Sequence, residues 1–170
     1  YFYYDMIHFL KTHEDNNLVE ELSKIKNESI FNDIIIYLVE HNKLDIIKKI
    51  NEIVGIDFKM KNNILLNNAI YHQYYDIVKY LIDNDVEVAA NNNIAIKISI
   101  IDKSKGAYKV ILKNSNVYSD VNFDINKSFE IFKLLIWSNE NINVHAENEY
   151  LLKFACYEGR VDIAKYLISL

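Results

Sequence analysis

The sequence offers few side chains that could do covalent chemistry. Its single cysteine, Cys156, would need a nearby base and access to substrate in order to act as a nucleophile. Cys156 follows Ala155 in an apolar stretch, which predicts that the thiol is buried and packs as a small apolar group. One cysteine forms neither an internal disulfide nor a thiolate zinc cage. It fits a reducing compartment, so we expect the cytoplasm or the nucleus.

The histidines are the next candidates for chemistry. His41 and His72 lie 31 residues apart at equivalent positions of a repeat, so we expect them to stack along one edge. A shared zinc ion would require both rings to lie about 2.0–2.1 Å from the metal, whereas packed helices are about 8–10 Å apart. No cysteine and no third histidine occupies the equivalent position of another repeat unit. We therefore interpret the histidines as solvated and expect no metal and no cofactor.

The charge and glycine content exclude further classes of function. The chain has 19 basic and 24 acidic residues and a formal net charge of -5, and Arg160 is its only arginine. Such a chain lacks the cationic footprint that binds phosphate backbones. Three glycines leave no Gly-rich phosphate loop, and no run approaches the ~20 apolar residues of a membrane span. We expect no catalysis, no nucleic acid and no membrane.

The chain is organised by an internal repeat. An acid, an apolar residue, any residue, a lysine, any residue and then Ile or Leu occur in this order four times, with acid-to-acid spacings of 31, 54 and 32 residues. An acid near the start of a helix faces the positive end of the backbone dipole, and the apolar positions form a buried stripe. The pattern therefore predicts four helices that start at its acids, which are Asp45, Asp76, Glu130 and Asp162.

A second, shorter helix is predicted upstream of two of these acids, at Ile64 to Ile70 and at Tyr150 to Cys156. Ala69 and Ala155 occupy matching positions there, and small residues let neighbouring helices approach closely. Asparagines precede these helices and are predicted to cap them with their side chains. These asparagines are Asn62, Asn63, Asn92, Asn93 and Asn148. Short extended segments follow the second helices, at Gly55 to Phe58, Val86 to Ala90 and Ile142 to Ala146.

These residues resemble the ankyrin repeat, a unit of about 33 residues made of two antiparallel helices and a loop. The resemblance is strongest from Asn148 to Ile168, where Ala155-Cys156 stands at the family's Ala-Ala and Gly159 at its turn glycine. Val161-Asp162-Ile163 stands at its Leu-Glu-Ile, and Asn141 to Ala146 is similar to the segment that closes a family repeat. The asparagine-rich form resembles the long ankyrin arrays of giant DNA viruses of amoebae.

The chain departs from the family at two turns and lacks the Thr-Pro-Leu-His signature. Asn42 and Gln73 replace the turn glycine, and glutamine adopts the left-handed conformation less readily than asparagine. The resemblance implies an all-α, ankyrin-like helical-repeat solenoid of about five stacked helix-turn-helix units. The predicted units are a degenerate first unit at 1–27, then 30–60, 61–90, 91–146 and an incomplete 147–170.

The unit 91–146 is too long for one repeat. Two interpretations compete: an insertion near Asp102 to Lys127 between its two helices, or an intact repeat followed by half of another. Turn-forming residues flank Ala107 to Leu112, which predicts a short helix there. Because insertions in solenoids often map to the binding face, one interpretation is that this segment widens a binding surface; the other is a tolerated insertion or a decayed repeat. The start at Tyr1 and the apolar end at Leu170 predict a piece of a longer protein, with at least one more repeat.

The resemblance implies that surface positions on the first helices and the loop tips bind a partner. Aromatic residues are enriched among interface hot spots, so two tyrosines at equivalent places are of interest. The candidate residues are Asn67, Tyr71, His72, Lys153, Tyr157 and Glu158. Trp137, late in a second helix, is predicted to pack rather than to contact a partner.

The sequence thus predicts a monomeric, non-enzymatic scaffold that binds another protein. A viral adaptor that acts on a host protein in the host cytoplasm is one form of this function. The alternatives are a docking or regulatory segment of an enzyme whose catalytic domain lies outside this sequence, and a purely structural spacer.

Overall fold

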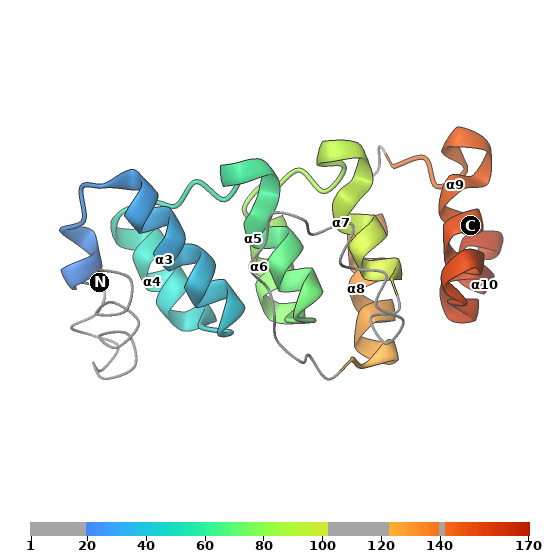
Figure 1. Ribbon diagram of the computed structural model, residues 1–170, viewed down its shortest axis with the longest axis horizontal. Coiled ribbons are helices and arrows are strands. Elements are labelled where there is room, and N and C mark those ends of the chain that lie inside the picture. Colours follow the sequence, from blue (N-terminus) through green and yellow to red (C-terminus); the bar gives the residue numbers. More distant parts are fainter. Residues whose placement is uncertain (1–19, 102–122, 140–141) are drawn as a thin grey trace. The chain divides into compact units, whose positions relative to one another are not determined.

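A computed structural model describes residues 20–101, 123–139 and 142–170 of the chain (Figure 1). Every regular element in these ranges is a helix, as the sequence predicts, and none of them is a strand. The segments that follow the second helices are irregular chain and turns. None of the described helices is both long and apolar enough to cross a membrane. Most of the predicted first unit, 1–27, lies outside the described residues.

The chain divides into two compact units, Tyr1–Asp57 and Phe58–Leu170. The first unit contains α3 (Glu28–Glu40) and α4 (Leu44–Ile53), which pack against each other. The second unit contains three helix pairs: α5 (Met60–Tyr71) and α6 (Tyr75–Asp83), α7 (Ala90–Ile100) and α8 (Ile125–Trp137), and α9 (Ala146–Glu158) and α10 (Val161–Ser169). In this unit α5 contacts α7 and α7 contacts α9, while α6 contacts α8 and α8 contacts α10. Each helix of a pair thus packs on its counterpart in the next pair.

The repeated sequence pattern forms the buried side of the second helices. Its two apolar positions lie one helical turn apart and therefore face the same way. All eight side chains are buried, as predicted: Ile46 and Ile50 in the first unit, and Ile77, Leu81, Ile131, Leu135, Ile163 and Leu167 in the second. The small residues Ala69 and Ala155 are also fully buried, which confirms their predicted place in the close contacts between helices.

Three of the four predicted helix starts are confirmed. The acid lies in the first turn of α4, α6 and α10. The start predicted at Glu130 is wrong, because α8 already begins at Ile125. The carboxylate of Asp124 accepts hydrogen bonds from the backbone N–H of Asn126 at 2.9 Å and of Lys127 at 3.3 Å, so this side chain caps the helix one turn earlier.

The predicted caps are wrong at Asn62, Asn63, Asn93 and Asn148. These four asparagines adopt left-handed backbone conformations, which asparagine tolerates better than most residues, whereas a capping residue is extended. The residues with positive φ here are Lys61, Asn62, Asn63, Asn93, Asn148 and Glu149, and the side chain of Asn92 lies outside the described residues. The regular right-handed part therefore begins at Ile64 in α5 and at Tyr150 in α9, where the sequence placed these helices. Asn63 is buried and donates through Nδ2 to the carbonyl oxygen of Glu87 at 2.7 Å.

The turns inside the helix pairs share one geometry despite their different residues. Asn42, Gln73 and Gly159 all have positive φ, at 56°, 58° and 72°. In each turn the next backbone N–H bonds to a carbonyl five residues earlier, which is the Schellman arrangement that closes a helix end. These bonds join Lys43 N to Leu38 O at 2.9 Å, Tyr74 N to Ala69 O at 2.9 Å, and Arg160 N to Ala155 O at 2.8 Å.

The overlong unit 91–146 contains α7 and α8, which pack directly against each other. This contact is what an insertion between the two helices of one unit requires. Residues 102–122 lie outside the described residues, and so does the helix predicted at Ala107 to Leu112.

Candidate protein-interaction surface

The candidate surface lies on one side of α9. Residues three and four apart share a face of a helix, and Leu151, Ala155 and Glu158 form the buried face of α9. A different face carries Tyr150, Lys153, Phe154 and Tyr157, of which Tyr150, Lys153 and Tyr157 are exposed and Phe154 is half-buried. With Lys97 of α7, these residues are called the α9 face below.

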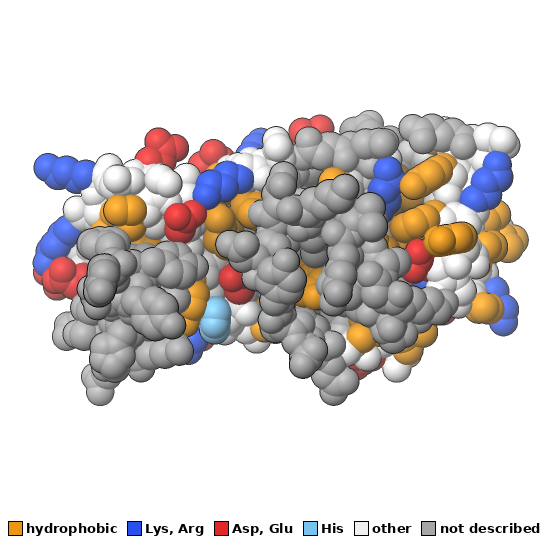
Figure 2. Space-filling model, in the orientation of Figure 1, with side chains coloured by type: hydrophobic (Ala, Val, Ile, Leu, Met, Phe, Trp, Pro, Cys, Tyr) orange, Lys and Arg blue, Asp and Glu red, His pale blue; other side chains and the backbone are white. Residues whose placement is uncertain are grey.

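Contacts between rings, and between a ring and an ammonium group, join the side chains of the α9 face. The rings of Tyr150 and Phe154 stack with their centroids 6.0 Å apart, and the ammonium group of Lys97 lies 4.9 Å from the centroid of Tyr150. The face therefore spans two neighbouring first helices. Figure 2 shows hydrophobic side chains over α9 with basic side chains beside them. Stacked aromatic rings lose little side-chain freedom when they bind, which suits them to contact a partner.

The structure separates the six residues predicted to bind a partner. Lys153 and Tyr157 are exposed on the α9 face, as expected, and Asn67 and His72 are half-buried. The exposure expected for Tyr71 and Glu158 is wrong, because both side chains are buried. Lys97, Tyr150 and Phe154 were not among the six, although Lys97 and Lys153 occupy equivalent positions of their helices.

The two equivalent tyrosines have opposite environments. Tyr71 is 2% exposed and Tyr157 is 81% exposed. Tyr71 belongs to α5, which is covered by the following pair through its contact with α7. The side chain of Tyr157 is thus exposed in the described chain, whereas that of Tyr71 belongs to the core.

Cys156 is exposed, so the predicted burial of its thiol is wrong. The preceding residue, Ala155, takes the buried position. Successive residues of a helix point about 100° apart, so the Ala-Cys pair cannot bury both side chains against the same neighbour.

Each described histidine contacts residues near it in sequence. His41, in the first unit, stacks on Tyr37 at 3.8 Å, and its Nδ1 lies 2.8 Å from the carbonyl oxygen of Tyr37. His72, in the second unit, stacks on Tyr74 at 5.3 Å. No group of three or more metal-ligating side chains occurs among the described residues.

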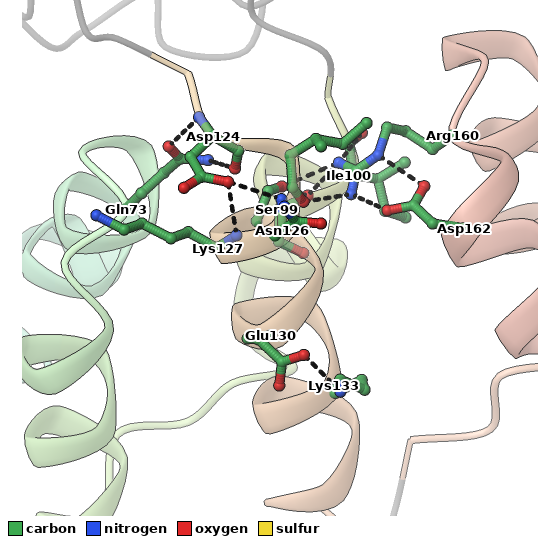
Figure 3. A network of polar contacts seen from close by, with 12 residues as sticks. Gln73, Ser99, Ile100, Asp124, Asn126, Lys127, Glu130, Lys133, Arg160 and Asp162 are labelled. Atoms are coloured by element: carbon green, nitrogen blue, oxygen red, sulfur yellow. Dashed lines mark hydrogen bonds and ion pairs between the residues drawn. The ribbon is translucent and has the colours of Figure 1, made fainter.

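A polar cluster that the sequence did not reveal lies around Arg160 (Figure 3). Arg160 immediately precedes α10 and is 1% exposed. Its Nη1 donates to the carbonyl oxygens of Ser99 and Ile100, both at 3.2 Å, and to Oγ of Ser128 at 2.9 Å. Its Nη2 lies 3.5 Å from the carbonyl oxygen of Ile125. The guanidinium thus joins the end of α7 to the first turn of α8.

Asp162 balances the charge of Arg160. Its carboxylate accepts from Nε at 3.0 Å and from Nη2 at 2.7 Å, a two-pronged pair that the planar guanidinium favours. Burial acts to raise the pKa of Asp162, but the hydrogen bonds and positive charge of Arg160 outweigh it, so that this pKa is lowered. The ring of Phe123 lies 6.0 Å from the guanidinium carbon.

The Arg160 cluster lies at the end of α7, where the chain leaves the helix in an extended conformation at Ile101. Ser99 is equivalent in the repeat to Ala69 and Ala155, whose carbonyls accept a backbone N–H from the Schellman turn. The carbonyl of Ser99 accepts hydrogen bonds from Oγ of Ser128 at 2.6 Å and from Nη1 of Arg160 at 3.2 Å. Two side chains therefore satisfy a buried acceptor that would otherwise be costly.

Gln73 holds the chain that leads into α8. Its Nε2 donates to the carbonyl oxygen of Asp124 at 2.8 Å, and its Oε1 accepts from the N–H of Asp124 at 2.9 Å. Gln73 is buried although it stands at the turn position filled by Asn42 and Gly159 in other pairs. A longer side chain at a turn that favours glycine was the only sequence signal of this contact.

Trp137, predicted to pack, is only partly packed. Its ring contacts Tyr166 at 6.5 Å and the ammonium group of Lys133 at 5.8 Å, yet it remains 66% exposed.

No protein-family model, curated protein or solved structure matches this chain.

Proposed function

We propose that the chain is an ankyrin-like helical-repeat module that binds another protein through the α9 face. The observation that carries this proposal is the exposed stripe of Tyr150, Lys153 and Tyr157 on one first helix. Tyrosine supplies a large, rigid contact area and is enriched among the residues that contribute most to binding energy.

Three features of the second unit support a repeat arrangement. Each helix contacts its counterpart in the next pair, and the turns after α5 and α9 use the same Schellman bonds. The repeated apolar positions are buried in every pair. A helix pair of this size cannot bury its apolar side alone, so each pair is stabilised by its neighbours. The second helices and the Arg160 cluster then act as the rigid base for the α9 face.

The test is affinity capture from an amoebal lysate, because the resemblance to the repeat arrays of giant viruses suggests a host there. The bound proteins are identified by mass spectrometry. We expect a double variant, Lys153→Ala with Tyr157→Ala, to lose a protein that the unaltered chain retains. A matched control combines Lys165→Ala with Ile168→Ala, which removes an exposed lysine and an exposed apolar residue from α10.

The control variant is expected to retain the same protein as the unaltered chain. Equal capture by both variants would contradict binding through the α9 face. Capture of nothing beyond the bare resin would contradict a protein-binding function for this chain.

A further inference from the structure

A histidine and a glutamate are paired at the start of α9. Both carboxylate oxygens of Glu149 lie close to Nδ1 of His145, at 3.0 and 3.1 Å. His145 immediately precedes α9, and its backbone N–H donates to Oδ1 of Asn143 at 3.0 Å. The pair therefore joins the chain that leads into α9 to the first turn of the helix.

The backbone of Glu149 is held in a conformation that glutamate rarely adopts. Asn148 and Glu149 have φ values of 57° and 62°, which lie in the left-handed region. The Cβ atom makes this region unfavourable for most residues, and asparagine tolerates it better than glutamate does. The contact with His145 thus offsets strain at a residue whose side chain alone would favour another conformation.

The equivalent turns of the second unit contain no such pair. Asn63 of α5 and Asn93 of α7 stand at the position of Glu149, and both have left-handed φ, at 61° and 58°. The residues at the position of His145 are Lys59 and Ala89, which also immediately precede their helices. The same backbone turn is therefore formed by an asparagine in two pairs and by a glutamate beside a histidine in the third.

The strength of the pair depends on whether the imidazole is protonated. Histidine is the side-chain type whose charge changes between about pH 5 and 8. A protonated imidazole attracts a carboxylate, whereas a neutral imidazole offers it at most a hydrogen bond. His145 is the only histidine that follows His72 in the sequence.

We propose that His145 and Glu149 form a pH-sensitive clamp on the left-handed turn at the start of α9. Protonation of His145 adds an attraction to the carboxylate of Glu149. The left-handed turn is therefore favoured below about pH 6 and is released in part above about pH 7. The clamp is a conformational device of the fold, and it does not depend on the proposed function.

Other charges near the clamp come from α9 and from α7 and α10, which pack against it. The charged residues of these helices are Glu147, Glu149, Lys153 and Glu158 in α9, Lys97 in α7, and Asp162 and Lys165 in α10. Lys153 lies one turn after Glu149, and the side chain of Glu147 lies outside the described residues. None of these residues is a histidine, so we assign the change between about pH 6 and 8 to His145.

The experiment measures the backbone carbon chemical shifts of Asn148 and Glu149 by NMR at about pH 6 and about pH 8. These shifts report the backbone conformation. Glu149→Gln keeps the length of the side chain but removes its charge. Glu149→Asn introduces the residue that the equivalent turns of α5 and α7 carry. Asn93 is a control within the same molecule, because no histidine lies in its turn.

In the unaltered chain we expect the ratio of left-handed to other conformations at Glu149 to fall about twofold from the lower to the higher pH. The effect is modest because the side chains of His145 and Glu149 are 50% and 43% exposed, and exposed pairs are weak. Glu149→Gln should have a lower ratio that no longer depends on pH. Glu149→Asn should keep the left-handed turn at both pH values, and the shifts of Asn93 should not change.

A further variant, His145→Gln, separates protonation from hydrogen bonding. Glutamine can still donate a hydrogen bond to Glu149 but does not titrate, so the dependence on pH should disappear. Added salt should reduce the dependence in the unaltered chain, since the pair is partly exposed. Circular dichroism checks that every variant keeps its helices. Identical shifts of Glu149 at the two pH values in the unaltered chain, or an undiminished dependence on pH in Glu149→Gln or His145→Gln, would overturn the inference.

Discussion

The guanidinium of Arg160 lies against the carbonyl oxygen of Ser99, 61 positions earlier in the chain, with Nη1 at 3.2 Å. This carbonyl is the equivalent of those that accept a backbone N–H in the other turns. A side chain from the last helix pair therefore completes the end of a helix in the pair before it. The contact makes the stability of α7 dependent on α10.

Replacement of Arg160 should be costly even when the charge is kept. Arg160→Lys retains a cation but cannot reach Ser99, Ser128 and Asp162 together, because lysine lacks the planar fork. We expect it to lower the free energy of unfolding by about 2–4 kcal/mol, as for other buried polar contacts that lose a partner. Urea unfolding followed by circular dichroism measures this change. Lys165→Met, at an exposed site of α10, is the control and should change stability by less than about 0.5 kcal/mol. Similar stability of Arg160→Lys and the unaltered chain would show that the cluster contributes little.

The pair of Arg160 and Asp162 predicts a dependence on pH. Because the pKa of Asp162 is lowered from its ordinary value of 3.8, the folded state favours the ionised carboxylate. Its contribution to stability is full above that ordinary value and is lost as the pH falls through the lower pKa of the folded state. Asp162→Asn removes the contribution at all pH values. The difference in unfolding free energy between the two proteins should be largest near neutral pH and shrink below about pH 4. A constant difference down to about pH 3 would rule out this assignment.

Glycine should have opposite effects at two equivalent turns. Asn42 and Gln73 both have positive φ, a conformation that glycine adopts without strain. Asn42→Gly removes an exposed side chain and should leave stability unchanged or raise it by up to about 1 kcal/mol. Gln73→Gly loses both hydrogen bonds to Asp124 and should cost about 1–2 kcal/mol despite the relieved backbone. Thermal unfolding of the two variants compares them directly. Equal effects at both positions would mean that the contact with Asp124 does not stabilise the fold.

Adjacent positions in α9 should respond differently to leucine. Ala155 is fully buried, so Ala155→Leu should overpack the contact between helices and cost about 1–3 kcal/mol. Ala69→Leu should behave in the same way for the same reason. Cys156→Leu places the same side chain at an exposed site and should be nearly neutral. Melting temperatures would refute the helix register if Cys156→Leu proved the more damaging change.

The equivalent tyrosines provide a comparison of stability with binding. Tyr71→Ala empties a buried site and should cost about 3 kcal/mol or more. Tyr157→Ala alters an exposed side chain and should change the unfolding free energy by less than about 0.5 kcal/mol. Denaturant unfolding measures both. A loss of stability in Tyr157→Ala as large as in Tyr71→Ala would show that Tyr157 belongs to the core and cannot serve as a free contact.

The helical frame was predictable because it depends on local periodicity. Ile77 and Leu81 are one turn apart, and the same spacing recurs in every second helix, so their burial could be read from the sequence. The left-handed turns at Asn42 and Gly159 also follow from residue type. The start of α8 was missed because Asp124, outside the repeated pattern, caps the helix before Glu130 is reached.

The candidate site was only partly predictable, because exposure depends on the neighbouring pair. Tyr71 and Tyr157 are equivalent in sequence, yet Tyr71 is buried and Tyr157 is exposed, a difference that residue type alone does not signal. The partners of Arg160 are mostly backbone carbonyls, which every residue possesses and which leave no mark in a sequence. One signal was present: Arg160 is the single arginine among 19 basic residues, at a site where lysine could not replace its geometry.

The fixed positions of Ile101 and Phe123 have a consequence for how this gene can vary. Gln73 bonds to the backbone of Asp124, just after Phe123, and Arg160 bonds to the last residue of α7 and the first residue of α8. Residues of other helix pairs therefore fix where α7 ends and where α8 begins. The gene can therefore vary at Gln73 or at Arg160 only together with the ends of α7 and α8, although neither residue belongs to these two helices.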